Sequence, residues 1–441
     1  MKNRALKILS FIFIVAFILS LSGCAILDMY LDSSASTDDI KFDSSEGLLI
    51  SSIDINSDGE LIIIYSNGSK QNLGCVVGQN GNINVDINGN SNDASYAVTK
   101  GLRSAVSVQS SFNVYNQYGM LSSVSAAGSG VIYKLYRETN SAFIVTNYHV
   151  VFDEDSVNDN GIADSIYVYL YGSEYGDMKI PATYVGGSRN YDIAVLRVDN
   201  CEALENNVFL EAELADSDKT YVGQSAIAVG NPDGAGVSAS YGIISVYSER
   251  ITLNIGGSVS LRVMRIDTPV NSGNSGGGLY NENGELIGIV NAKTSDESLE
   301  NIGYAIPSNI VKAVADNIID HCYNTELECV QRALLGVTVG ISSSSPYLTD
   351  DGHVKIKETV FISEVSQDGI AYDKLKKNDI LIFAKLNDTE IEITQQYQII
   401  DFLLNARVGD TLYITVERTT KNGIENITLE IPITKDAINE Y

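Results

Sequence analysis

Tryptophan is absent from this 441-residue chain, and histidine, cysteine and positive charge are scarce. The three histidines and five cysteines form no CxxC pair and no His/Cys cluster with metal-ligand spacing, so no His/Cys metal site and no cofactor is predicted. Lysine and arginine number 29 against 56 aspartates and glutamates, which gives a net charge of −27. Such an excess of negative charge disfavours binding to nucleic acid or to an anionic membrane through charge.

An apolar run near the start, Ile8 to Leu21, has 14 residues and is too short to span a bilayer comfortably. It follows a basic start and ends in Leu21-Ser22-Gly23-Cys24, which resembles a bacterial lipoprotein signal. This resemblance implies removal of residues 1–23, a lipid on Cys24 and an exported protein tethered to the bacterial cell membrane. A plain secretory signal or an uncleaved anchor is the alternative.

The next part of the chain divides by composition. Residues 24–46 are rich in Ser and Asp and are predicted to form a disordered tether. Residues 47–77 alternate apolar runs with Asp-Gly and Asn-Gly dipeptides, which predicts a small three-stranded β module, and the Gly/Asn-rich residues 78–95 are a linker. Asp54 to Gly59 also matches the start of a calcium loop, but Tyr65 stands where a glutamate is expected, so a turn is the other interpretation.

A glycine-dense polar segment, Asn271 to Gly278, lies between two apolar runs and has the composition of a nucleophile loop. A serine hydroxyl attacks a carbonyl only when a base takes its proton and N–H groups face the oxyanion that forms. The glycines around Ser275 allow backbone turns that aim the N–H groups of Gly273, Asn274 and Ser275 into one oxyanion hole. An ordinary glycine-rich hairpin loop is the alternative.

Two further motifs favour catalysis, because each sets a polar residue within an apolar, β-branched run. His149 lies in Thr146-Asn147-Tyr148-His149-Val150, and Asp192 opens Asp192-Ile193-Ala194-Val195-Leu196. Together with Gly273-Asn274-Ser275-Gly276-Gly277, these motifs resemble the chymotrypsin-fold serine proteases, and closely the HtrA (Deg) family, over about residues 97 to 435. The resemblance implies a triad of Ser275, His149 and Asp192. Gly278 departs from the family, which usually has proline there.

Many short strands separated by turn signals fit two six-stranded β-barrels with the triad between them, in a protease domain spanning 96–325. The segment from Ser110 to Ala127 is predicted to be a polar loop over the active-site face. A helix is expected after Pro307, capped by Ser308, with an apolar stripe. His321 beside that stripe is expected to be a surface histidine.

An acidic insertion, residues 153–164, partly matches a calcium loop, although Ser156 occupies the leading ligand position; the alternative is an acidic surface loop. Four cysteines remain after Cys24, namely Cys75, Cys201, Cys322 and Cys329. Their even number permits disulfides outside the cytoplasm, and Cys322 and Cys329 are close enough in sequence to form one.

Residues 331–435 resemble a PDZ domain, an α+β fold, so the predicted fold class is mainly β: a chymotrypsin-like double β-barrel followed by a PDZ domain, with a small N-terminal β module. The string Leu334-Leu335-Gly336-Val337 leads into a strand, as in a loop that binds a peptide carboxylate. A small β domain acting as a spacer is the alternative.

The function predicted is that of an exported serine endopeptidase acting on unfolded or misfolded proteins. Pro269, six residues before Ser275, stands where trypsin-type enzymes place an aspartate, so cleavage after Lys or Arg is not expected. The resemblance implies small or aliphatic P1 side chains, recruitment of substrate C-termini, and a homotrimer formed through Tyr96 to Leu102. The rival hypothesis is a catalytically silent PDZ binding or holdase scaffold.

Overall fold

The computed structural model describes residues 50–55, 60–65, 70–75, 94–173, 179–234, 236–291, 302–322 and 330–440. The chain divides into two compact units, Met1–Gly89 and Asn90–Tyr441, and each is described by itself. The predicted signal, Cys24 and the tether to residue 46 lie outside the described residues, as does Cys329.

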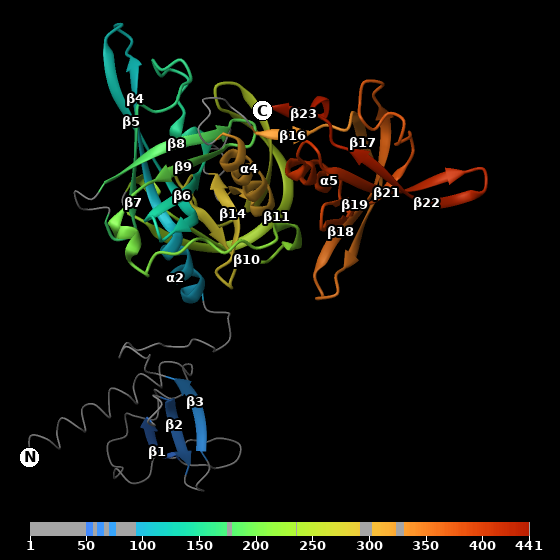
Figure 1. Ribbon diagram of the computed structural model, residues 1–441. Helices are drawn as coiled ribbons and strands as arrows, with labels where there is room; N and C mark the ends of the chain where they lie inside the picture. Colours follow the sequence, from blue (N-terminus) through green and yellow to red (C-terminus); the bar gives the residue numbers. More distant parts are fainter. Residues whose placement is uncertain are drawn as a thin grey trace, which may run out of the picture. The chain divides into compact units, whose positions relative to one another are not determined.

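The first unit contains the predicted β module, an antiparallel sheet in the order β1-β2-β3 (Figure 1). Its strands are β1 (Ile50–Ile55), β2 (Glu60–Tyr65) and β3 (Lys70–Cys75). The apolar run Cys75 to Val77 predicts the third strand, whereas β3 spans Lys70–Cys75, because the backbone ladder with β2 includes the polar residues before Cys75. Ile55 pairs with Leu61, so the candidate calcium loop joins two strands of a hairpin, which favours the turn interpretation.

The second unit begins with α2 (Ala94–Ser104) and a closed six-stranded barrel, called barrel 1, in the order β4-β5-β6-β9-β8-β7. Its strands are β4 (Ala105–Tyr115), β5 (Leu121–Tyr136), β6 (Ser141–Thr146), β7 (Ser165–Leu170), β8 (Ile180–Ser188) and β9 (Ile193–Val198). All six residues of β6 are buried, as the apolar run before His149 predicts.

The predicted loop from Ser110 to Ala127 is wrong, because β4 and β5 continue through it as one hairpin. The ladder runs from Ser110 paired with Ala126 to Tyr115 paired with Leu121. Serine and asparagine at every second or third position hid the strand pattern, although a strand with a solvated face accepts such residues.

A second closed barrel, barrel 2, has the order β10-β11-β12-β15-β14-β13. Its strands are β10 (Ser225–Gly230), β11 (Ser238–Asn254), β12 (Ser258–Ile266), β13 (Gly278–Tyr280), β14 (Leu286–Asn291) and β15 (Gly303–Pro307). Three short 3-10 helices, η2 (Glu202–Glu205), η3 (Ser217–Lys219) and η4 (Pro232–Gly234), lie between β9 and β11. The predicted pair of six-stranded barrels is confirmed.

Two helices pack across the pair of barrels. The helix α2 precedes barrel 1 but packs on β10 and β13 of barrel 2, where a Cβ on Gly101 would lie 2.8 Å from Val229. The helix α4 (Ser308–His321) follows barrel 2 and packs on β8 and β9 of barrel 1 as well as on β14. The two helices therefore hold barrel 1 and barrel 2 together at two places.

The expected apolar stripe of α4 is buried throughout, but Ser308 is its first helical residue rather than its cap. The Ser308 hydroxyl donates to the carbonyl of Ala215 at 2.6 Å, and Pro307 occupies the cap position. Cys322 at the end of this helix is disulfide-bonded, and its predicted partner Cys329 lies outside the described residues. None of the helices within the described ranges is both long and apolar enough to cross a membrane.

The C-terminal domain has a sheet in the order β17-β18-β19-β21-β22, with β20 paired to β19, and a separate pair β16-β23. Its elements are β16 (Gln331–Ala333), β17 (Val337–Leu348), β18 (Val354–Val365), β19 (Ile380–Leu386), β20 (Thr389–Glu392), α5 (Gln396–Phe402), η5 (Leu403–Asn405), β21 (Thr411–Thr420), β22 (Gly423–Pro432), η6 (Lys435–Ala437) and β23 (Ile438–Glu440). The composition of Ala371 to Leu375 predicts a helix-like stretch, but residues 371–374 form turns instead. The mainly β fold class is confirmed.

The barrels and the C-terminal domain meet through a buried charge pair. Arg262 of β12 lies 2.6 Å from Asp401 of α5 without hydrogen-bond alignment, and its guanidinium lies 4.0 Å from the ring centroid of Tyr397. Burial raises the pKa of Asp401 to about 6, while the charge of Arg262 opposes that rise. One face of α5 therefore rests on barrel 2.

Candidate active site

His149 and Asp192 form a close pair at the rim of barrel 1. His149 lies in the one-turn helix α3 (Tyr148–Val151) after β6, and Asp192 directly precedes β9. Asp192 Oδ2 is 2.8 Å from His149 Nδ1, and Asp192 Oδ1 accepts the His149 main-chain N–H at 3.0 Å. Because the carboxylate is fully buried and accepts from Nδ1, the imidazole is fixed with Nε2 as its proton acceptor.

The backbone of Asp192 is strained in a way that serves this pair. Its φ is 50°, in the left-handed region that a residue with a Cβ rarely adopts. The Asn147 amide donates to the Asp192 carbonyl at 2.9 Å, and that contact holds the turn. The strain aims the carboxylate back at His149 rather than along the strand.

Asn291 is a residue of the site that the sequence analysis missed. It is the last residue of β14, it is fully buried, and its Nδ2 donates to Asp192 Oδ2 at 2.7 Å. A hydrogen bond to a charged group typically contributes about 1.5–3 kcal/mol. The available signal was an asparagine ending the otherwise apolar run from Leu286, because a buried amide needs a polar partner.

Ser275 lies in the turn between β12 and β13, with little of its surface exposed, and its flanking glycines fit the predicted loop. Gly273 and Gly276 have φ values of 92° and 87°. A Cβ on Gly276 would lie 2.1 Å from the Ser129 carbonyl oxygen and 2.3 Å from Thr146 Oγ1, which only glycine avoids. The structure thus places the residue after Ser275 against the strand that leads directly to His149.

Ser129 of β5 ties the serine loop to barrel 1. Its N–H donates to the Ser275 carbonyl at 2.8 Å, and its hydroxyl donates to the Gly273 carbonyl at 2.6 Å. The same hydroxyl accepts the N–H of Asn231 at 2.7 Å. One buried serine therefore fixes the loop on both sides of Asn274.

One of the three predicted oxyanion-hole donors, the Asn274 N–H, is already hydrogen-bonded within the turn. The Asn274 N–H donates to the Asn271 carbonyl at 3.0 Å within the turn, so it does not face a substrate. The N–H groups of Gly273 and Ser275 stay a prediction for this role.

Comparison with known proteins agrees with this geometry. A family model described as a trypsin-like peptidase domain matches residues 128–289. The serine protease Do-like HtrA of Lactococcus lactis subsp. cremoris is 31% identical over 376 residues, covering 78% of this chain and 84% of that protein. This chain belongs to the HtrA family of serine proteases. It is accordingly a serine endopeptidase.

Other HtrA relatives match over shorter parts. The serine protease Do-like HtrA of Bacillus subtilis is 31% identical over 316 residues, covering 69% of this chain and 64% of that protein. The periplasmic pH-dependent serine endoprotease DegQ of Escherichia coli is 34% identical over 256 residues, covering 58% of this chain and 49% of that protein.

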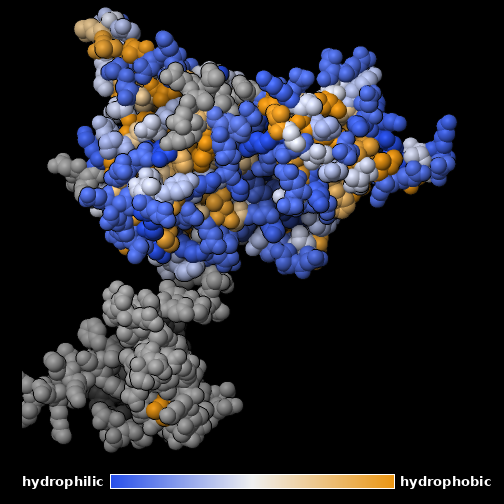
Figure 2. All heavy atoms as spheres, viewed as in Figure 1, coloured by the Kyte–Doolittle hydropathy of each residue, from blue (hydrophilic) through white to orange (hydrophobic). Residues whose placement is uncertain are grey.

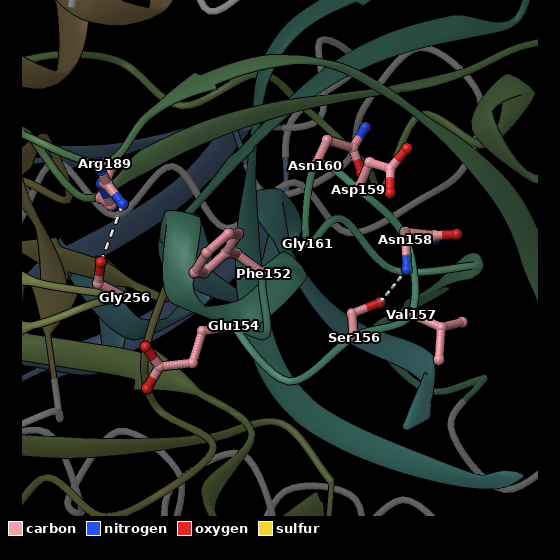
Figure 3. Close-up of a pocket in the computed structure, with 10 residues that line it drawn as sticks. All are labelled: Phe152, Glu154, Ser156, Val157, Asn158, Asp159, Asn160, Gly161, Arg189 and Gly256. Atoms are coloured by element: carbon pink, nitrogen blue, oxygen red, sulfur yellow. Dashed lines mark hydrogen bonds between the residues drawn. The ribbon is translucent and has the colours of Figure 1, made fainter. Parts of the chain in front are cut away.

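The acidic insertion of this HtrA protein borders a separate pocket of about 570 Å³, beside Phe152, Arg189 and Gly256 (Figure 3). Oxygens of the insertion that could bind calcium accept hydrogen bonds from the insertion itself. Asn158 Nδ2 donates to the Ile162 carbonyl at 2.8 Å and to Asp164 Oδ1 at 3.3 Å. An amide group thus stands among the oxygens that a calcium ion would bind, which favours the surface-loop interpretation. Among the described residues, no group of three or more His, Cys, Asp and Glu is arranged to bind a metal.

The predicted peptide-binding string borders a groove of about 780 Å³ between β17 and α5. The residues Leu334, Leu335, Gly336 and Val337 line it together with Arg250 of β11, Arg332, and Gln396, Ile399, Ile400 and Leu403 of α5 and η5. Gly336 has a φ of 72°, and a Cβ there would lie 2.4 Å from Gly369, so its glycine is required by the neighbouring turn.

Proposed function

We propose that this HtrA protein hydrolyses unfolded or damaged proteins with Ser275 as nucleophile, His149 as general base and Asp192 as the group that orients His149. The observation that carries the proposal is the Asp192 carboxylate at 2.8 Å from His149 Nδ1, across the cleft from a serine loop built on glycines with positive φ. That arrangement leaves His149 Nε2 to face the nucleophile.

The reaction follows from these positions. Ser275 Oγ attacks the carbonyl carbon of a peptide bond while His149 Nε2 takes its proton, and the oxyanion rests on the N–H groups of Gly273 and Ser275. Asp192 stabilises the imidazolium, which then protonates the leaving amine as the C–N bond breaks. Water attacks the acyl-enzyme while His149 takes a proton from it, and His149 returns that proton to Ser275 Oγ as the ester C–O bond breaks, which releases the carboxylic acid and free Ser275.

The substrate side chain at P1 is proposed to be small or aliphatic. Pro269 stands where an enzyme specific for Lys or Arg would place a carboxylate, and it is followed by Val270. Peptides with Ala, Val or Leu at P1 are expected to be cleaved faster than those with Lys, and a peptide series with one P1 change at a time tests this.

The C-terminal domain is proposed to be a PDZ domain whose groove binds substrate C-termini as an added strand beside β17. The groove's position between β17 and α5, and its closure by Leu334 to Val337, support this role. Apolar peptides with a free carboxyl end should bind, and their amidated forms should bind much more weakly; equal affinities in a polarisation titration contradict it.

The protein is proposed to act outside the cytoplasm, tethered by a lipid on Cys24. The lipoprotein-like segment before Cys24 supports this, as does the printed name of the Escherichia coli relative, which calls it periplasmic. A homotrimer through Tyr96 to Leu102 remains part of the proposal: Tyr96 and Leu102 are only half-buried on α2, whereas Ala97 is fully buried. Light scattering that shows a monomer at micromolar concentration contradicts the trimer.

The decisive experiment is digestion of casein by the wild type and by Ser275→Ala, with labelling by a fluorophosphonate. The wild type should digest casein and take the label, and the variant should do neither while keeping its circular dichroism spectrum. Wild-type protein that binds unfolded chains but neither labels nor cleaves them would instead establish the silent scaffold.

A further inference from the structure

The hairpin of β4 and β5 extends well beyond barrel 1 (Figure 1). The ladder between β4 and β7 ends where Ser111 pairs with Ser165, whereas β4 and β5 stay paired as far as Tyr115 and Leu121. The loop 153–164 supports one side, up to a bridge between Val114 and Ser156. Past that bridge, none of the other described strands pairs with the hairpin.

The hairpin carries no charge. Residues 104–133 contain no Asp, Glu, Lys, Arg or His, in a chain of which 19% is charged. Thirteen of these 30 residues are buried, and at the chain average of 19% the remaining 17 would carry about three charged side chains. Charged side chains keep exposed strands soluble and prevent them from pairing with other chains. The hairpin lacks this protection, which marks its surface as a candidate contact surface.

The tip of the hairpin exposes large side chains. Tyr115, Tyr118, Met120 and Leu121 are 68%, 75%, 59% and 58% exposed. Figure 2 shows apolar atoms gathered at this end of the molecule. Exposed apolar groups that cluster in one place are typical of a surface that contacts another phase or partner.

The turn at the tip pairs several of its own backbone groups. The Asn116 side chain accepts the N–H groups of Tyr118 and Met120 at 2.9 and 3.0 Å, and the Asn116 N–H donates to the Met120 carbonyl at 2.9 Å. Backbone groups that are already paired can leave water at low cost, which is the requirement for entering a lipid phase. The tip is thus an uncharged turn whose backbone is in part hydrogen-bonded internally and which exposes several large side chains.

We propose that this tip inserts shallowly into a lipid bilayer, with Met120 and Leu121 at the acyl boundary and Tyr115 and Tyr118 at the headgroup level. Tyrosine suits that level because its ring is apolar and its hydroxyl is wet. A neutral tip approaches lipid without the repulsion that the net charge of −27 creates elsewhere.

A second copy of the chain is the less fitting occupant. A stable dimer needs about 800 Å² of buried surface on each partner, and a tip of four large side chains does not supply that. A weak lipid contact, in contrast, needs only to add to another membrane signal, because two weak signals together give stable attachment. The lipid proposed on Cys24 would be such a signal in this chain.

The absence of tryptophan makes the test clean. Tyr118→Trp in the full chain places one tryptophan at the tip, and Tyr136→Trp places one at the other end of β5, at a tyrosine that is 46% exposed. With neutral phosphatidylcholine vesicles, the emission of Tyr118→Trp should shift to the blue, and brominated phosphatidylcholine should quench it about twofold. The Tyr136→Trp protein should change little.

A second pair of variants separates lipid insertion from other causes. Adding Leu121→Asp to Tyr118→Trp should reduce the quenching at least about fivefold, because a carboxylate resists transfer to the acyl boundary. Adding Leu348→Asp, on a residue of β17 that is 68% exposed, should leave it unchanged. Hydrolysis of a short soluble peptide should be the same in all these proteins.

Three results overturn the proposal. The first is a Tyr118→Trp emission that stays water-like and unquenched with vesicles. The second is equal quenching of Tyr118→Trp and Tyr136→Trp. The third is a blue shift that depends on protein concentration without vesicles, which would assign the tip to contact between copies of this chain.

Discussion

The two barrels share one strand order but contribute different chemistry. In both, the third strand in sequence leads to a polar connection: β6 to the segment with His149, and β12 to the loop with Ser275. In both, a polar residue lies where the fifth strand turns into the sixth: Asp192 before β9, and Asn291 at the end of β14. Asp192 and Asn291 are hydrogen-bonded to each other, at 2.7 Å.

Each of these two connections in barrel 1 therefore lies beside the connection at the same place in the strand order of barrel 2. His149 and Ser275 come from one equivalent pair, and Asp192 and Asn291 from the other. In the proposed mechanism, barrel 1 supplies the groups that move and stabilise a proton, whereas barrel 2 supplies the nucleophile and a neutral amide. Neither barrel alone holds the proposed site, since its chemistry needs groups from both barrels.

Removing one group from either barrel should have the largest effect. Ser275→Ala and His149→Ala should each lower kcat by about 10⁴–10⁶-fold, because the two groups act as one unit. The double variant should be no worse than either single one. Steady-state hydrolysis of a peptide measures this, with circular dichroism as the control for folding. A double variant that loses a further large factor would mean that the barrels act independently.

Crowding the contact between the barrels should come next. Gly276→Ala places a Cβ 2.1 Å from the Ser129 carbonyl oxygen, which displaces the serine loop and should lower kcat by about 10²–10³-fold. The matched control is Gly119→Ala: its φ of 71° is equally positive, but nothing lies within 4 Å of the new Cβ. Similar losses in the two variants would show that backbone strain, and not crowding, matters.

Removing the amide of barrel 2 should have an intermediate effect. Asn291→Ala takes one donor from the buried Asp192 carboxylate, and about 1.5–3 kcal/mol corresponds to about a 10- to 100-fold loss of kcat with little change in KM. Asn291→Ser, which keeps a donor, should recover part of it. Asn281→Ala, a buried asparagine elsewhere in barrel 2, is the control. Unchanged kcat in Asn291→Ala would remove Asn291 from the site.

The smallest effect is expected where a helix crosses between the barrels. The Tyr280 hydroxyl of β13 lies 2.7 Å from Ser104 Oγ of α2, and both are buried. Tyr280→Phe should lower the free energy of unfolding by about 1 kcal/mol and leave kcat unchanged. Chemical denaturation of this variant, of Ser104→Ala and of the double variant measures the coupling. Additive losses would mean that the two hydroxyls do not stabilise each other.

The sequence predicts the parts of this molecule in which a polar motif residue stands within or beside an apolar strand pattern. Ser275, His149 and Asp192 stand in motifs whose spacing is local, so the sequence predicts them as site residues together with the barrels that carry them. Asn291 was missed because its role depends on a contact with Asp192, 99 residues away in sequence. The β4–β5 hairpin was missed because serine and asparagine hide a solvated strand, and turns were mistaken for a helix at Ala371 to Leu375.

The helices α2 and α4 each pack on the barrel that lies further away in sequence, and this packing affects what happens when the chain is cut by a protease. The connection between the barrels passes through exposed residues such as Glu205 and Val208, where another protease, or a second copy of this one, would reach the backbone first. A cut there leaves α2 on the amino-terminal piece but packed on barrel 2, and α4 on the carboxyl-terminal piece but packed on barrel 1. Each fragment therefore packs a helix on the barrel of the other fragment, so the two fragments of the nicked chain should stay associated.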